Sequence, residues 1–178
     1  ATADTGQSFA RFRFRDFSGA ISYTGLVQNG EVEDYAINIA ISKIKLDVKV
    51  ILGAAVLPGW TPGDPAIMDT SLNLKGYLPL AQPYNDPSAI WHYTGPEQVP
   101  AMNKADIIDW VHTEVRETSG GPSSATSATI VAEQALFLLN DGSIVGLDGS
   151  SLPEINHTPS ADLYLVVWHR NHLGIMSA

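Results

Sequence analysis

Two histidines near the C-terminal end of the chain have the residue type and spacing for metal or proton chemistry. His169 and His172 stand three residues apart in the run His-Arg-Asn-His-Leu-Gly, and imidazole is both a common metal ligand and a proton carrier near neutral pH. Residues three apart along a strand point to opposite faces, so both rings reach one metal only across a turn. No further histidine or carboxylate stands beside them at metal-site spacing. We therefore predict two structural side chains at the end of a strand, with no metal between them.

A dense acidic cluster and a row of arginines near the N-terminus offer a second kind of chemistry. Carboxylates suit Ca²⁺, which takes about six to eight oxygen ligands, but three arginines repeat at every second position of the run Ala-Arg-Phe-Arg-Phe-Arg. Opposite charges that face each other across two strands contribute about 0.2–1 kcal/mol. We favour such an ion-pair ladder, with Glu31 and Glu33 across from the arginines, over a calcium site. The six residues are Arg11, Arg13, Arg15, Glu31, Glu33 and Asp34.

Four aromatic side chains lie in a loop-rich stretch, residues 57–105. This stretch holds eight of the eleven prolines, which excludes long regular elements from it. Exposed aromatics in loops stack on sugar rings or on a neighbouring protein, and the same side chains can instead cap the end of a hydrophobic core. Both interpretations stay open from the sequence. The four residues are Trp60, Tyr84, Trp91 and Tyr93.

The sequence lacks recognisable catalytic motifs. It contains no Gly-x-Ser-x-Gly, no phosphate loop and no His-Glu-x-x-His. The run Asn140–Gly149 hints at a calcium loop but lacks the alternating ligands and the closing glutamate of an EF-hand, and two hairpin turns account for it. We expect a protein that is not an enzyme, with no catalytic residues and no resident cofactor.

Composition and charge exclude several classes of protein. The chain has 178 residues with 10 basic and 19 acidic side chains, a formal charge of −9, and residues 51–178 carry the whole deficit. A nucleic-acid binder needs clustered cations for the phosphates, so neither nucleic acid nor anionic lipid is an expected partner. The longest apolar runs fall far short of the about 18 residues of a membrane helix, which argues against insertion into a membrane. The absence of cysteine excludes disulfides, thiolate metal sites and a cysteine nucleophile.

An alternation of period two runs through most of the chain and predicts the strands that position these residues. Short strands separated by turn signals are expected over 10–15, 31–39, 44–50, 107–117, 129–139, 143–147 and 163–170, with a helix as an equal alternative over 132–136. The apolar phase shifts by one residue at Ser42–Lys43, and such a shift marks a bulge or a break. We predict an all-β fold, an antiparallel β-sandwich of residues 43–178 preceded by a strand-bearing arm of residues 1–42.

Two segments resemble known families of secreted bacterial proteins. The arginine run, Ser22–Gly25 and the string Asn-Gly-Glu-Val-Glu-Asp-Tyr at 29–35 are similar to the end of a GEVED domain. Residues 44–178 resemble the module that follows GEVED domains in extracellular proteins often labelled hemagglutinin-like, and the resemblance departs at His112 and Thr113, where similar modules tend to carry apolar residues. The matching segments are Lys45–Leu52, Met68, Gly76–Pro79, Gln82–Tyr84, Asp109–Val111, Glu114–Arg116, Asp141–Gly149 and His169–Ser177. The resemblance implies an extracellular, cell-surface or adhesive role and brings no catalytic residues.

The arm leads to an expectation about function. Two or three strands cannot bury their own apolar face, and an open strand edge invites another strand. The arm either folds back on residues 44–178 of its own chain or packs on a neighbouring copy, and we favour the neighbour. We therefore expect a non-enzymatic structural or adhesive surface protein that forms a homopolymer by strand exchange between copies. The alternatives are a sugar-binding module, Ca²⁺-dependent or not, that would bind surface glycans, and, more weakly, an accessory domain of a secreted hydrolase. The apolar arm residues expected to make the contact are Phe12, Phe14, Ile37 and Ile39.

Overall fold

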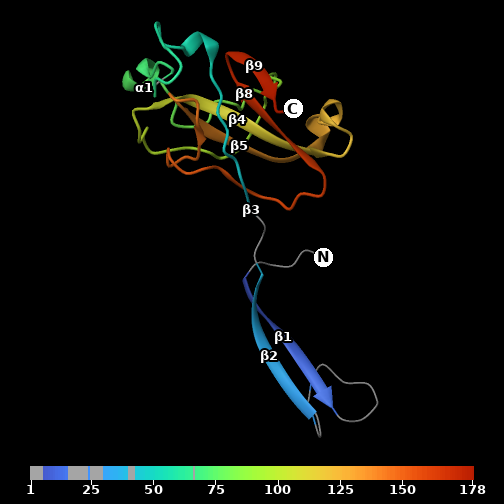
Figure 1. The fold of residues 1–178 in the computed structure, drawn as a ribbon. Helices are drawn as coiled ribbons and strands as arrows, with labels where there is room; N and C mark the ends of the chain where they lie inside the picture. The colour runs from blue at the N-terminus through green and yellow to red at the C-terminus, as the bar shows by residue number, and fades with distance from the viewer. Residues whose placement is uncertain (1–5, 16–23, 25–29, 40–42, 66) are drawn as a thin grey trace. The chain divides into compact units, whose positions relative to one another are not determined.

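The computed structural model describes residues 6–15, 24, 30–39, 43–65 and 67–178 (Figure 1). The chain divides into two compact units, Ala1–Ser42 and Lys43–Ala178. This division lies where the apolar phase of the sequence shifts by one residue. Each unit is described by itself below.

The first unit contains an antiparallel hairpin of β1 (Gly6–Arg15) and β2 (Gly30–Ile39). Alternating side chains give each strand two different faces. One face of the hairpin carries Phe12 and Phe14 from β1 with Tyr35 and Ile37 from β2, and the rings of Phe12 and Tyr35 meet edge to face at 5.7 Å. The opposite face carries Arg11 and Arg13 of β1. The hairpin therefore has one mainly apolar face, which is called the aromatic face below.

The second unit is built on a five-stranded antiparallel sheet in the order β6-β5-β4-β8-β9. Its strands are β4 (Ile107–Thr118), β5 (Ile130–Leu139), β6 (Ile144–Val145), β8 (Asp162–His169) and β9 (His172–Met176). A separate pair joins β3 (Lys43–Lys45) to β7 (Glu154–Asn156). The all-β prediction is confirmed, and residues 132–136, for which strand and helix were open, are strand.

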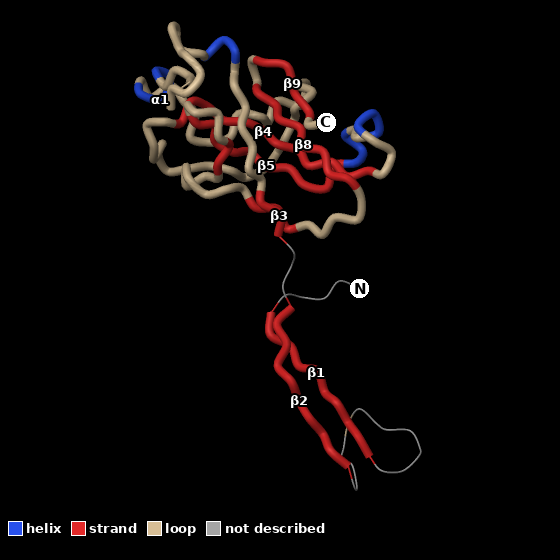
Figure 2. Tube along the Cα trace, viewed as in Figure 1, coloured by secondary structure: helices blue, strands red, loops and turns tan. Residues whose placement is uncertain are grey.

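Among the described residues, helical structure is limited to single turns outside the sheet (Figure 2). These are α1 (Ser71–Leu74) and 3-10 turns at Gly53–Ala55, Pro122–Ser124 and Ser127–Thr129. Within the part of the chain that the structure describes, no helix has the length and apolar character needed to cross a membrane.

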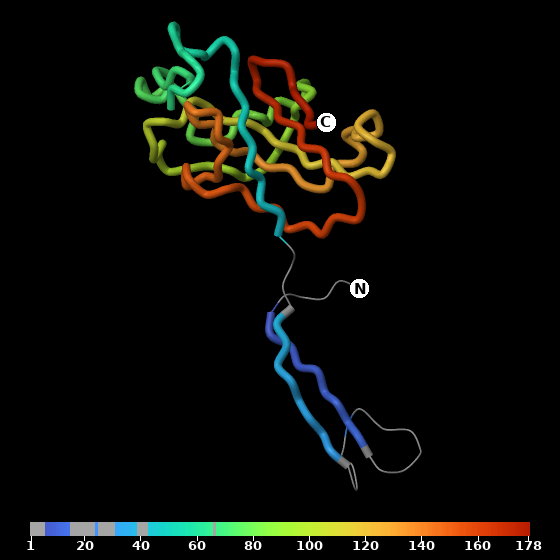
Figure 3. Tube along the Cα trace, in the orientation of Figure 1, coloured from blue at the N-terminus to red at the C-terminus, as the bar shows by residue number. Residues whose placement is uncertain are grey.

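Both faces of the five-stranded sheet are covered, and the covering layers are mostly irregular chain. Residues 48–56 cross one face of the sheet, shown in cyan in Figure 3, and are tied to the β5–β6 turn by the bonds Val50 N–H to Gly142 O and Ile144 N–H to Val48 O. The first hydrophobic core lies between these residues and the sheet, and it comprises Val50, Leu52, Met68, Ile108, Val111, Leu136, Leu138, Ile144 and Val167. The second core, on the other face, comprises Leu78, Tyr84, Val99, Ile107, Trp110, Ala135, Phe137 and Val145.

This layering refines the predicted sandwich. The described residues of the second unit form one large sheet between two layers of loops, where the prediction expected two facing sheets. The prolines of 57–105 explain the difference, because proline removes a ladder donor and so keeps the layer over the second core out of regular strands. Buried apolar side chains from those loops, such as Leu78 and Val99, take the place of a second sheet.

Gly174 of the edge strand β9 lies against the indole ring of Trp168. A Cβ atom at Gly174 would come within 2.3 Å of ring carbons of Trp168, so only glycine fits beneath the ring. The indole is held there because its Nε1–H donates to Glu114 Oε1 at 2.6 Å.

We predict that Gly174→Ala destabilises the second unit by about 1–3 kcal/mol, because the added methyl group overpacks the site. Thermal unfolding followed by tryptophan fluorescence measures the change, since all four tryptophans lie in residues 43–178. Gly53→Ala is the matched control, because a Cβ at Gly53 meets nothing within 4 Å. Equal melting temperatures for the two variants would contradict the packing argument.

Candidate functional site

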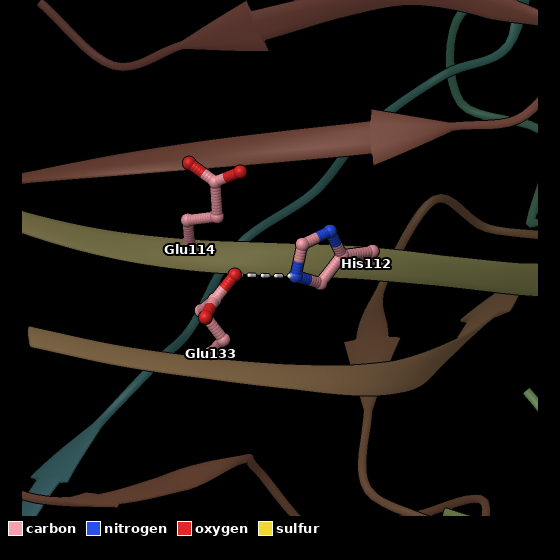
Figure 4. Close-up of side chains that lie close together, drawn as sticks. All are labelled: His112, Glu114 and Glu133. Carbon is pink, nitrogen blue, oxygen red and sulfur yellow. Dashed lines mark ion pairs between the residues drawn. The ribbon is translucent and has the colours of Figure 1, made fainter. Parts of the chain in front are cut away.

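Three side chains with metal-ligating atoms meet on one face of the central strand β4 (Figure 4). His112 and Glu114 are two residues apart on β4 and therefore point to the same face. Glu133 of β5 pairs directly with Glu114 and joins them on that face. One ligand atom from each residue lies within 4.8 Å of those of the other two. These three residues are called the His112 cluster below.

The imidazole of His112 is wholly buried and held by stacking. Its ring lies 4.7 Å from the ring of Tyr93 at an interplanar angle of 15°, and its side chain is 0% exposed. Nε2 is 3.4 Å from Glu133 Oε1, but neither ring nitrogen makes a hydrogen bond to the described residues. Burial lowers the pKa of His112 to about 4, although the carboxylates of Glu114 and Glu97 oppose that shift. The ring is therefore neutral at pH 7, with an available nitrogen lone pair.

The two carboxylates of the cluster differ in their surroundings. Glu114 is buried, and its Oε2 accepts two hydrogen bonds from Arg116, at 2.5 and 2.8 Å, while its Oε1 accepts the indole N–H of Trp168. The side chain of Glu133 is one-third exposed. Partial burial and the nearby charge of Glu114 raise the pKa of Glu133. Glu114 is thus fixed in place, whereas Glu133 connects the cluster to solvent.

The sequence pointed to only part of this cluster. His112 stood out as a departure from a family resemblance, and Glu114 as part of a matching segment, but no site was predicted from them. The signal available was the spacing of two in His-Thr-Glu on an expected strand, which places both side chains on one face. Glu133 could not be added without the register of β4 against β5.

A second cluster joins Asp109, His169 and His172. His169 Nε2 lies 3.2 Å from Asp109 Oδ2, and the two histidine Nδ1 atoms are 2.9 Å apart. When His169 Nε2–H donates a hydrogen bond to Asp109, Nδ1 of His169 carries no proton and is an acceptor. The hydrogen bond between the two rings is then donated by His172 Nδ1–H. Burial and the neighbouring His169 lower the pKa of His172. Arg170 completes the cluster by donating to both oxygens of Asp109.

The expected position of His169 is confirmed, because it is the last residue of β8. The turn that the two rings need in order to meet is present, because Arg170 and Asn171 form a turn and pair His169 with His172 across the β8–β9 hairpin. An open apolar hollow of about 380 Å³ lies beside the rings. It is lined by Val50, Ile51, Leu52, Val111, Val167, His169, His172, Leu173 and Ile175. That no metal bridges the two histidines stays a prediction.

The expected contact between the arginine and acidic strands is confirmed. Arg11 Nε and Nη2 donate to the two oxygens of Asp34 at 2.6 and 2.7 Å. The expected partners were wrong in detail, because Glu31 and Glu33 pair with Phe14 and Phe12 and so lie on the aromatic face. Asp34 lies on the opposite face, and the three carboxylates therefore do not gather at one point.

The side-chain hydrogen bond from Arg11 lowers the pKa of Asp34, and the charge of Arg13 adds to that shift. Arg13 lies opposite Val32. At the two ends of the ladder, Arg15 pairs with Gly30 and Ile39 pairs with Gly6. The side chains of Arg15 and Ile39 lie outside the described residues.

The four loop aromatics have different roles. The prediction that Tyr84 stacks on a ligand is wrong, since its ring is fully buried and its hydroxyl donates to Trp110 O at 2.7 Å. Trp91 and Tyr93 are half-buried and pack against the second core. Trp60 is half-buried and lines a shallow hollow of about 300 Å³. Core capping therefore accounts for three of the four, and Trp60 alone keeps a surface suited to stacking.

The run Asn140–Gly149 forms turns, as predicted. Gly142, with a φ of 88°, accommodates the turn between β5 and β6. Asp141 accepts hydrogen bonds from Ser143, and Asp148 from Ser150 and Ser151. Both carboxylates are thus used to stabilise turns.

Comparisons with protein-family models, with curated proteins and with solved structures find no match for this chain. Three features of the described residues bear on function, namely the aromatic face of the hairpin, the His112 cluster, and the histidine pair beside its apolar hollow.

Proposed function

We propose that this chain is a non-enzymatic structural or adhesive protein of the cell exterior whose copies associate through the β1–β2 hairpin. The observation that carries the proposal is the aromatic face. Phe12, Phe14, Tyr35 and Ile37 are 48%, 59%, 51% and 42% exposed, and by register they share one face, on which Glu31 and Glu33 lie opposite the two phenylalanines. An apolar face of this kind marks a surface that another protein covers.

The strand edges of the hairpin support the same proposal. Within the described residues the hairpin is a two-stranded sheet, so each strand keeps one edge free for a further strand. A two-stranded hairpin is marginally stable alone and gains from added strands or a covering layer. Backbone pairing would supply affinity, and the alternating aromatic side chains would supply specificity.

The second unit offers a surface that can receive a hairpin from another copy. β9 lies at the end of the strand order and is itself an edge. Leu173 and Ile175 on this strand are 92% and 52% exposed, and the apolar hollow of about 380 Å³ lies beside them. A contact between the hairpin of one copy and the β9 edge of the next is heterologous, and such contacts build rings or filaments.

Sedimentation velocity over a wide range of concentrations, with electron microscopy of the same samples, tests the proposal. We expect the sedimentation coefficient to rise with concentration and ordered rings or filaments to appear. A chain that stays monomeric at every concentration would overturn self-association.

The hollow at Trp60 favours a second candidate function, the binding of surface glycans. An aromatic ring at the edge of a shallow hollow is suited to stacking on a sugar ring. The hollow is lined by Leu57, Pro58, Gly59, Trp60, Asp64 and Pro65. Glycan-array binding that is lost in Trp60→Ala and retained in Trp91→Ala would support this function, and an array without signal would exclude it for the glycans tested.

A further inference from the structure

We propose that His112, Glu114 and Glu133 form a binding site for a divalent transition-metal ion, with Zn²⁺ the closest match to one imidazole and two carboxylates. Zinc takes histidine nitrogen and carboxylate oxygen at about 2.0–2.2 Å. Imidazole disfavours Ca²⁺ and Mg²⁺, which prefer oxygen ligands. The site is independent of the hairpin and of self-association.

The unpartnered imidazole is the first observation behind the proposal. His112 is fully buried, and neither ring nitrogen makes a hydrogen bond among the described residues. Leaving a buried polar group unsatisfied costs about 1–3 kcal/mol, so such a group in a native protein calls for a ligand, a water or an ion. Nε2 faces the carboxylate of Glu133 (Figure 4), which places this nitrogen beside the other two ligands.

The charge around the ring is the second observation. Glu114 and Glu133 stand directly opposite each other in the β4–β5 ladder, where like charges repel. Glu97 adds a third carboxylate, since its Oε1 accepts the N–H of Ala135, the residue paired with His112. Arg116 offsets one of these charges through Glu114. A divalent cation would neutralise the remaining two.

The supporting contacts resemble those of metal sites. Metal-binding carboxylates are usually held by further hydrogen bonds, and Glu114 is held by Arg116 and Trp168. Tyr93 fixes the plane of the His112 ring by stacking on it, and its hydroxyl donates to Glu97 at 2.6 Å. The partly exposed side chain of Glu133 gives the ion a path from solvent.

The geometry requires only a small adjustment. Ligand atoms around a tetrahedral ion at these bond lengths lie about 3.4 Å apart, and the three atoms here lie within 4.8 Å of one another. Closing the widest of these separations takes side-chain shifts of at most about 1.4 Å. Three protein ligands leave a fourth position for water.

Calorimetric titration of the full chain with Zn²⁺, and in parallel with Ca²⁺, tests the site. We expect Zn²⁺ to bind with one-to-one stoichiometry and raise the melting temperature, and Ca²⁺ to do neither. Glu133→Gln is the main variant, because its partly exposed side chain can change without disturbing the core, and it should weaken Zn²⁺ binding at least tenfold. His112→Gln should abolish binding. If it fails to fold, Glu133→Gln keeps the test decisive.

His172→Gln is the matched control, because it removes a histidine from the other cluster and leaves His112 intact. Wild-type affinity in this control supports the proposed site. Loss of Zn²⁺ binding in His172→Gln, with binding kept in Glu133→Gln, would place the ion at the histidine pair and overturn the proposal. Absence of Zn²⁺ binding to the wild-type chain would also overturn it.

Discussion

Replacing Phe12 and Phe14 together by serine is expected to abolish self-association at concentrations where the wild-type chain assembles. Removing one phenylalanine side chain from an apolar contact makes the free energy of association less favourable by about 2 kcal/mol. Two such losses amount to about 4 kcal/mol and weaken association about a thousandfold. Serine keeps the extended backbone and adds no charge beside Glu31 and Glu33, which lie opposite these residues. Sedimentation velocity of the two chains measures the difference.

The other face of the same hairpin provides the control. Phe9 and Val32 are 66% and 42% exposed, and by register they lie on the face that carries the Arg11–Asp34 ion pair. We expect Phe9→Ser with Val32→Ser to weaken association less than tenfold. Equal effects of the two double substitutions would show that apolar side chains of the hairpin promote association from either face and that the aromatic face is not a specific contact. Unchanged assembly in the Phe12 and Phe14 variant would exclude the aromatic face as the contact.

The hairpin shows how far alternation alone predicts a structure. Period-two patterns in residues 10–15 and 31–39 predicted both strands and their pairing through charge, and Arg11 with Asp34 confirms it. The alternation does not determine how two strands slide against each other, and a slip of one residue exchanges the two faces. In the observed register every odd-numbered residue of β1 faces an even-numbered residue of β2. Glu31 and Glu33 therefore miss the arginines.

The candidate sites were harder to predict because both depend on contacts between strands. The His112 cluster needs the register of β4 against β5, which brings Glu133 from 19 residues away in the sequence to face Glu114. The histidine pair needs the tight turn at Arg170 and Asn171, which the sequence does not mark with glycine or proline. The roles of the loop aromatics depend on how deeply each side chain is buried, because Tyr84 is part of the core whereas Trp60 lines a surface hollow. Sequence patterns located these residues but not their neighbours.

Asp109→Asn is expected to destabilise the second unit by about 3–5 kcal/mol, the cost of breaking a buried charge pair by removing one partner. The side chain of Asp109 is 6% exposed, and its carboxylate accepts hydrogen bonds from Trp110 N–H, His169 and Arg170. Asparagine has one acceptor oxygen where aspartate has two, and it cannot balance the charge of Arg170. Urea unfolding followed by tryptophan fluorescence measures the loss. Asp162→Asn, the same change at an exposed position of β8, should have an effect within about 0.5 kcal/mol.

The pH dependence of this loss separates charge from packing. Burial alone would raise the pKa of Asp109, but the hydrogen bond from His169 and the charge of Arg170 outweigh burial and hold that pKa below its ordinary value of 3.8. A carboxylate whose pKa is lowered by folding stabilises the folded state above its unfolded pKa, and the contribution disappears as the pH falls through the folded value. The difference in unfolding free energy between wild type and Asp109→Asn should therefore be constant near neutral pH and shrink below about pH 3.8. A difference that persists unchanged in acid would mean that Asp109 acts through its shape and not through its charge.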